Sequence, residues 1–264
     1  MSLKSILRGL APIAAIAIAA AASGGCDQIR NHVSINGEEG KKLADLDLSG
    51  ATPDQVMLLG PDSVRIATGD ALAITVEGDP QVTEAMRFTL KDGTLGIMRK
   101  SGQWDGDDAR ATINVTMPPP RKLTMAGSGR IDAADLAADK ARVTIAGSGT
   151  VETTRVETAE LKVDIAGSGS YRAVGNAKSL KLTIAGSGDA RLDALKVEDA
   201  KVDIAGSGNS AFASDGTVKA NIMGSGEVRV IGRATCKVTS MGSGRLVCEP
   251  SAAEPKPKGG KPKT

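Results

Sequence analysis

Residues 161–169 read LKVDIAGSG, and versions of this stretch recur at a nearly fixed interval through the second half of the chain. Its last three letters, Gly-Ser-Gly, occur seven times, and successive copies are 18 to 20 residues apart. The copies begin at Gly127, Gly147, Gly167, Gly186, Gly206, Gly224 and Gly242. A period near 20 residues is typical of a stacked repeat, in which no single unit can bury its apolar face alone.

Within each repeat the sequence has the pattern of short strands. In residues 161–165 apolar and polar side chains alternate, which indicates a strand with one buried face. The glycines that follow permit positive φ and a close approach of the backbone, so they predict a tight corner. Residues 170–173 alternate again, residues 174–179 are expected to close the turn, and no helical period is present. The pattern predicts an all-β fold, a parallel β-solenoid or β-helix with coils of about 20 residues and an N-terminal β cap.

Two columns of apolar residues are expected to fill the interior of the solenoid. One column contains Leu123, Val143, Val163, Leu182, Val202, Ala220 and Val238. The next contains Met125, Ile145, Ile165, Ile184, Ile204 and Ile222. Aliphatic side chains that stack on like side chains suit a narrow interior, and they explain a composition that is 41% hydrophobic but only 2% aromatic.

A cation stands between the inward-facing positions in every repeat. This cation column consists of Lys122, Arg142, Lys162, Lys181, Lys201, Lys219 and Lys237. Cations stacked about 5 Å apart repel one another, and the aspartates and glutamates nearby offset only part of that repulsion. Two interpretations remain open: a solvated face on which lysine prevents aggregation at strand edges, or a linear basic track that binds an anionic polymer such as an envelope polysaccharide.

A second polar column lies two residues further along each repeat, and it too is expected to face the solvent. It consists of Thr124, Thr144, Asp164, Thr183, Asp203, Asn221 and Thr239. Calcium-binding β-rolls need a regularly placed aspartate in each repeat. Here Asp164 and Asp203 are separated by Thr183, about two coils apart, so no metal site is predicted.

No pattern in the chain indicates catalysis. The serines between the corner glycines are expected to hydrogen-bond local backbone, and the only histidine, His32, lies far upstream. Phosphate-binding and dinucleotide-binding patterns are absent. The net charge is only +2 and aromatic residues for base stacking are missing, which argues against nucleic acid. We therefore predict a protein that is not an enzyme and needs neither cofactor nor metal.

The N-terminus has the pattern of a signal peptide, predicted over residues 1–25. Lys4 and Arg8 precede an uncharged, alanine-rich stretch over residues 10–22, which is short for a transmembrane helix. Residues 20–22 would suit ordinary signal peptidase, whereas residues 23–26 resemble a bacterial lipobox. We favour the second ending, which makes Cys26 a lipidation site and attaches the protein to the membrane. The predicted location is the periplasm of a Gram-negative bacterium, free or as a membrane-anchored lipoprotein.

The remaining chain divides into a linker over residues 26–59, a β-solenoid domain over residues 60–248 with its repeats in 119–248, and a disordered basic tail over 249–264. Two further cysteines, Cys236 and Cys248, fall in the last coil. In an oxidising compartment a disulfide between them would pin the open end of the solenoid. The alternative is a pair of buried thiols that pack as small apolar side chains.

The run Leu123-Thr124-Met125-Ala126-Gly127-Ser128-Gly129, with residues 62–66, 72–79, 92–95 and 113–118, resembles the putative auto-transporter adhesin head GIN domain family. The resemblance covers residues 60–248 and implies a β-solenoid exported to the bacterial envelope. It brings no catalytic or binding residues. We predict adhesin-like binding of a surface polymer or another surface protein. The alternatives are a polysaccharide-active β-helix enzyme and a purely structural envelope spacer.

Overall fold

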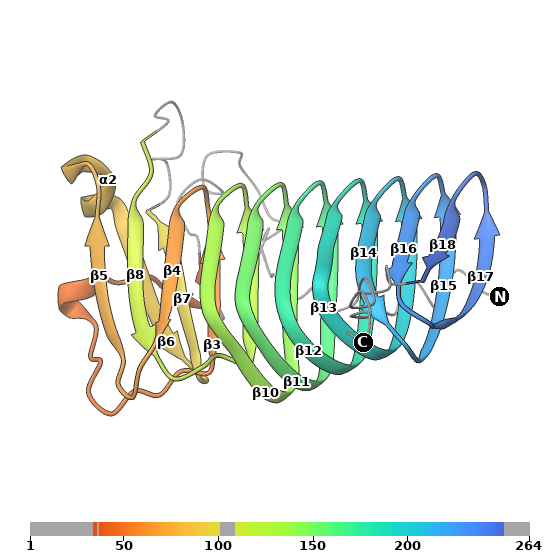
Figure 1. Cartoon of the computed structure of the whole chain (residues 1–264). Coiled ribbons are helices and arrows are strands. Elements are labelled where there is room, and N and C mark those ends of the chain that lie inside the picture. The colour runs from red at the N-terminus through yellow and green to blue at the C-terminus, as the bar shows by residue number, and fades with distance from the viewer. Residues whose placement is uncertain (1–33, 36, 101–108, 251–264) are drawn as a thin grey trace, which may run out of the picture.

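The computed structural model describes residues 34–35, 37–100 and 109–250, which form a rod of stacked strands (Figure 1). The described helices are η1 (Leu43–Asp45) and α2 (Pro80–Ala85), and all other regular elements are strands. Neither of these helices has the length and apolarity that a membrane span requires. The predicted all-β parallel β-solenoid is confirmed.

The coils stack so that each strand pairs in parallel with its equivalent one coil away. Their strands are β9 (Lys122–Gly127), β10 (Arg130–Gly147), β11 (Thr150–Gly167), β12 (Ser170–Gly186), β13 (Asp189–Gly206), β14 (Asn209–Ser214), β15 (Thr217–Gly224), β16 (Glu227–Ile231), β17 (Thr235–Met241) and β18 (Arg245–Glu249). The turn expected over residues 174–179 is wrong, because β12 continues through that segment. The strand bends there through a register irregularity between Arg172 and Val174 and keeps its pairing with β13.

The register places the two apolar columns as expected. Val143 lies beside Leu123 and Val163, and Ile145 beside Met125 and Ile165. These side chains are buried and belong to one continuous core that runs through the rod. The column ends at Val238, which is 50% exposed because no described coil follows it.

The Gly-Ser-Gly corners stack directly on one another. The first glycine of each corner has φ between 112° and 132°, a region that side chains other than glycine rarely adopt. At Gly206 a Cβ atom would lie 2.2 Å from the carbonyl oxygen of Gly186. Both the conformation and the stacking therefore require glycine at this corner.

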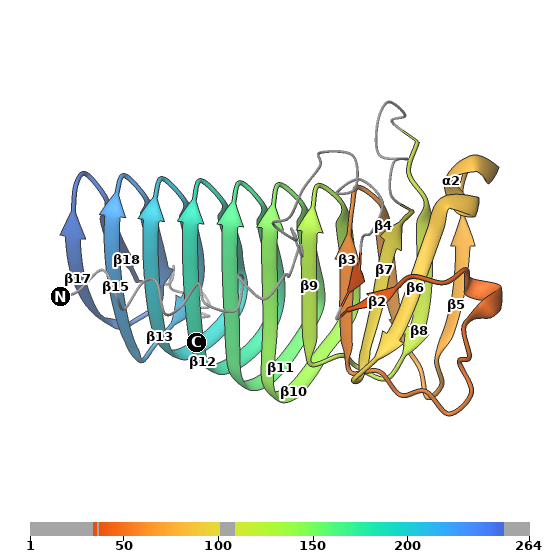
Figure 2. The same cartoon turned by 180° about the vertical axis from the view of Figure 1, so that it is seen from behind.

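The N-terminal end is closed by a cap in which pairing changes from parallel to antiparallel. Its strands are β3 (Gln55–Leu59), β4 (Ser63–Thr68), β5 (Ala73–Glu77), β6 (Met86–Lys91), β7 (Thr94–Arg99) and β8 (Thr112–Met117). β3 and β4 continue the parallel stack, whereas β5 and β6 run antiparallel to β8 and β7. The predicted N-terminal β cap is thus present (Figure 2).

The predicted linker over residues 26–59 is wrong at its C-terminal end. Gln55–Leu59 forms β3, which pairs with β9 and β7 in the main sheet. Val56 and Leu58 are buried, but Met57 and Leu59 are also apolar and hide the alternation. Short strands β1 (Ser34–Ile35) and β2 (Glu38–Glu39) also lie in this range. Helix α2 was not expected, although Asp79 and Pro80 form a clear helix start, with the Asp79 side chain accepting from the Gln81 backbone.

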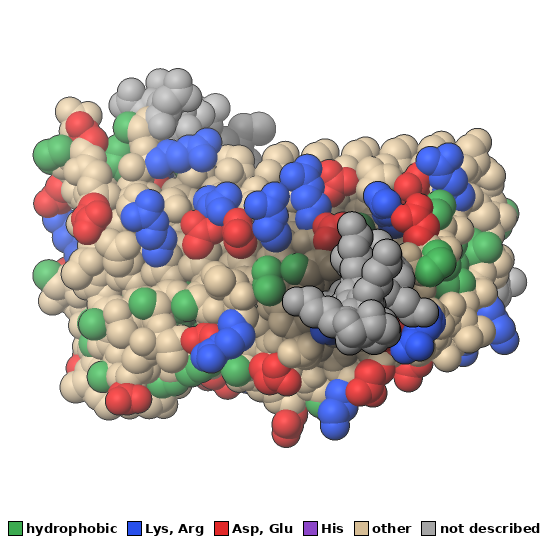
Figure 3. All heavy atoms as spheres, viewed as in Figure 1, with side chains coloured by type: hydrophobic (Ala, Val, Ile, Leu, Met, Phe, Trp, Pro, Cys, Tyr) green, Lys and Arg blue, Asp and Glu red, His purple; other side chains and the backbone are tan. Residues whose placement is uncertain are grey.

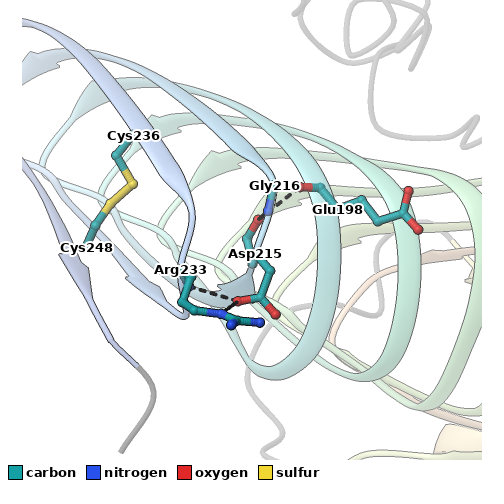
Figure 4. Close-up of a disulfide and its surroundings, with 7 residues drawn as sticks. Glu198, Asp215, Gly216, Arg233, Cys236 and Cys248 are labelled. Atoms are coloured by element: carbon teal, nitrogen blue, oxygen red, sulfur yellow. Dashed lines mark hydrogen bonds and ion pairs between the residues drawn. A yellow bond between two sulfur atoms is a disulfide. The ribbon is translucent and has the colours of Figure 1, made fainter.

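A disulfide joins Cys236 in β17 to Cys248 in β18 across the end of the core (Figure 4), with a Cα–Cα distance of 6.8 Å. In the same view the backbone N–H of Arg233 donates to Asp215 at 2.9 Å. A disulfide that closes a loop of this size contributes on the order of 3 kcal/mol. It holds together the two sheets of the last described coil, which among the described residues has a neighbouring coil on one side only.

Three predicted features lie outside the described residues. They are the signal peptide over residues 1–25, the lipidation site Cys26, and nearly all of the basic tail over 249–264. His32, the only histidine, also lies there.

Candidate functional site

The cation column forms one line along a sheet face. This face is built from β9, β15, β17 and the C-terminal parts of β10 to β13 (Figure 2). The strand registers pair Lys122 with Arg142, and then Lys162, Lys181, Lys201, Lys219 and Lys237 in turn. Neighbouring strands lie about 4.8 Å apart, so seven cations stand in a straight row. The fixed repeat positions make this arrangement readable from the sequence.

Three carboxylates neutralise part of the row. Asp164 forms ion pairs with Arg142 at 2.7 Å and with Lys162 at 3.8 Å. Lys181 pairs with Glu160 at 2.6 Å, and Lys201 with Asp203 at 3.2 Å. Across the described part of the chain, no ion pair engages the remaining three cations, Lys122, Lys219 and Lys237.

The row keeps an excess of four positive charges after these pairs. Its N-terminal end is partly enclosed: burial lowers the pKa of Lys122, and the nearby Arg142 and Arg121 act in the same direction. Further along, the hydrogen bond from Lys181 lowers the pKa of Glu160 and keeps this carboxylate ionised. From Lys181 onward the four lysines of the column are exposed. The C-terminal half is therefore the part most accessible to a ligand.

The expectation that the second polar column faces the solvent is wrong for most of its length. Thr124, Thr144, Asp164 and Thr183 are all buried. Their side chains are short, and the coils are close enough for longer neighbours in the cation column to cover them. Further along, Asn221 donates to Asp203 in the preceding coil at 2.7 Å, so these two polar groups make a contact between coils.

The face offers charge but no catalytic constellation. The described residues contain no cluster of three or more histidine, cysteine, aspartate or glutamate side chains placed to hold a metal ion. The corner serines between the glycines are exposed, as at Ser168 and Ser207. Asp164 and Asp203 are both held by cations of the column. The arrangement is suited to electrostatic binding.

A groove on another side of the rod was missed from the sequence. It follows the bends of successive coils, and its volume is about 1070 Å³. Figure 3, which views the molecule from this side, shows the surface hollowed there. Ala138, Ala159, Ala177 and Ala213 line it, together with acidic and basic side chains such as Glu198. The recurring alanines at the bends were the available signal, but they follow no strict period because the bends are irregular.

Comparison with protein families gives one clear match. The family model described as "Putative auto-transporter adhesin, head GIN domain" matches residues 52–234. This range begins just before β3 and includes the cap and most of the coils. No curated protein matches the chain.

Several solved structures are similar to this chain. A putative adhesin from Bacteroides fragilis NCTC 9343 shares 16% identity over 75% of this chain and 92% of its own, with a TM-score of 0.66. A putative lipid binding protein from Parabacteroides distasonis ATCC 8503 shares 21% identity over 75% and 93%, with a TM-score of 0.59. A putative adhesin from Parabacteroides merdae ATCC 43184 shares 19% identity over 84% and 100%, with a TM-score of 0.55. At these identities the likeness extends to the fold alone.

Proposed function

The chain belongs to the putative auto-transporter adhesin, head GIN domain family, and we propose that it is an exported, non-enzymatic binding protein of the bacterial cell envelope. Its ligand in this proposal is an anionic polymer, such as an acidic envelope polysaccharide, that lies along the cation column. The observation that carries the proposal is the in-register row of seven cations against three paired carboxylates.

A row of this kind suits a polymer better than a small ligand. Each exposed lysine alone gives a weak, screened attraction. A polymer with regularly spaced negative charges can contact several cations of the column at once. After the first contact has formed, each further contact is intramolecular. The adhesin description of the family and of two similar structures is consistent with binding to an extended surface molecule.

We expect the protein to bind dextran sulfate, a generic sulfated polymer, at low salt and to release it by about 0.5 M NaCl, because salt screens exposed charges. The triple variant Lys181→Gln, Lys201→Gln, Lys219→Gln should bind at least about tenfold more weakly, because it loses three of the four exposed lysines of the cation column. Binding is measured by biolayer interferometry with residues 27–264, which contain every described element.

A matched control removes three cations from another side of the rod. Arg172, Lys178 and Lys196 are exposed and lie outside the cation column. Their replacement by glutamine changes the net charge equally and should leave binding within about twofold. Equal losses in the two variants would mean that only net charge matters. No binding by the original protein would contradict the proposal and favour a structural spacer. Equal binding to unmodified dextran would show that negative charge is not what the protein recognises, and it too would contradict the proposal.

Delivery and anchoring belong to the same proposal, with residues 1–25 as a signal peptide and Cys26 as the lipidated residue. Cys26→Ser should shift most of the protein from the membrane fraction to the periplasmic fraction of a Gram-negative host, because the lipid is its anchor. Fractionation with immunoblotting measures this, alongside incorporation of labelled palmitate. Ser49→Ala, which lies downstream of the lipobox-like residues 23–26, serves as a control that keeps the cysteine. An unchanged membrane fraction for Cys26→Ser would contradict the anchor.

A further inference from the structure

The two ends of the described rod differ in how their strands are covered. Antiparallel strands close the N-terminal end. Among the described strands, β17 pairs only with β15 and β18 only with β16. Val238 and Met241 in β17 are 50% and 67% exposed. Val238 occupies a core column and is exposed only because that column ends there. The last coil is therefore an unpaired sheet edge with apolar side chains.

The backbone geometry shows which groups of this edge are free. The N–H of Thr235 donates to Gly216 in the preceding coil, and the N–H of Arg245 donates to Gly226. In a parallel ladder, alternate residues direct their N–H and C=O groups to opposite neighbours. The backbone N–H and C=O groups that point along the rod axis, away from the preceding coil, therefore belong to Cys236, Val238 and Ser240 in β17 and to Leu246 and Cys248 in β18.

We propose that a second copy of this chain docks end to end on this edge, related by a two-fold axis perpendicular to the rod. Such an axis reverses each strand, so β17 meets β17 of the second copy in antiparallel pairing. When Val238 pairs with its own equivalent, Cys236 lies opposite Ser240 of the second copy. All the outward hydrogen-bonding groups of β17 then face one another, and the exposed core column continues across the joint.

The same axis fits β18. Pairing centred on Val247 sets Leu246 opposite Cys248 of the second copy, so that the outward groups match again. It also sets Arg245 opposite Glu249 of the second copy, and opposite charges directly across a strand pair are favourable. Val238 lies five residues before the corner serine Ser243, and Val247 lies four residues after it. The two centres are thus nearly level, and one axis can serve both strands.

Charge and size also fit a second copy. In this register Lys237 lies opposite Thr239 of the second copy, so no like charges meet. The contact covers the cross-section of the rod, on the order of 1,000 Å² in total, which is at the small end of specific interfaces. We therefore expect a dimer with a micromolar Kd. Because the axis crosses both sheets, the cation columns of the two copies lie on one side and form a longer track.

The first test needs no polymer, so its outcome is independent of the proposed function. Sedimentation equilibrium of residues 27–264 from 1 to 200 μM should show a monomer–dimer equilibrium. Val238→Lys should abolish the dimer, because it places two like charges at the axis, while Val238→Leu should retain it. Circular dichroism checks that both variants remain folded. A monomer throughout this range, or a dimer unaffected by Val238→Lys, would overturn the proposal.

A crosslink tests the register itself. Val247 is its own partner at the axis, at a non-hydrogen-bonded position where Cα atoms are about 4.5 Å apart, so Val247→Cys should form a covalent dimer under mild oxidation. Arg229 lies beside Val247 one coil further in, and Arg229→Cys should remain monomeric on non-reducing gels. This pairing would be excluded if Arg229→Cys formed the covalent dimer and Val247→Cys did not, or if the two variants crosslinked equally.

Discussion

Gly206→Ala should lower the free energy of unfolding by roughly 3 kcal/mol or more, since it combines a strained backbone with a steric clash. Gly206 has φ of 132°, and its new Cβ would lie 2.2 Å from the Gly186 carbonyl oxygen. That oxygen cannot move away freely, because the N–H of Ser207 donates to it at 3.0 Å. Urea unfolding followed by circular dichroism measures the loss.

The adjacent corner serine provides the control. Ser207 is exposed, and Ser207→Ala leaves its backbone hydrogen bond in place. We expect a change within about 0.5 kcal/mol, as for most surface substitutions. If Gly206→Ala were as stable as Ser207→Ala, the stacked corners would not be what restricts these positions to glycine.

Arg99→Met should destabilise the cap by about 3–5 kcal/mol, because it leaves a buried carboxylate without its cation. The side chains of Arg99 and Asp62 are 4% and 0% exposed, and they pair at 2.6 Å. Arg99 also donates to the Ala109 carbonyl oxygen at 2.8 Å, and Asp62 accepts from the Ala111 backbone at 2.9 Å. The pair therefore ties together the start of β4, the end of β7 and the approach to β8. Thermal unfolding and hydrogen exchange of the cap measure the effect.

An exposed pair in the same cap gives the comparison. Lys42 and Glu84 pair at 2.9 Å with side chains that are 52% and 73% exposed, and Lys42→Met should cost no more than about 1 kcal/mol. Similar losses for Arg99→Met and Lys42→Met would show that burial does not set the strength of these pairs. Because coils contact only their neighbours, we expect exchange to rise mainly in the cap after Arg99→Met.

The positions of the cations in the candidate site could be predicted from the sequence, but which of them form ion pairs could not. The repeat period places Lys162, Lys181 and Lys201 in one row, since parallel coils of nearly equal length leave a single register. Whether a lysine is free depends on where its flexible side chain points. Lys201 turns to Asp203 in its own strand, whereas Lys181 turns to Glu160 in the preceding coil. The exposed half of the row emerged only from the structure.

The sequence by itself determined the all-β solenoid, its apolar columns, its glycine corners and the cap. These follow from interactions that repeat at each coil, so a single period encodes them many times over. Only the tertiary structure decided what depends on distant or irregular contacts. Examples are the inclusion of β3 in the main sheet, the continuous bend at residues 174–179, and the Asp62–Arg99 pair between residues 37 positions apart. The open edge at Val238 is another feature that only the tertiary structure decided. The repeats specify how one coil stacks on the next, but they do not show which strands of the last described coil remain unpaired.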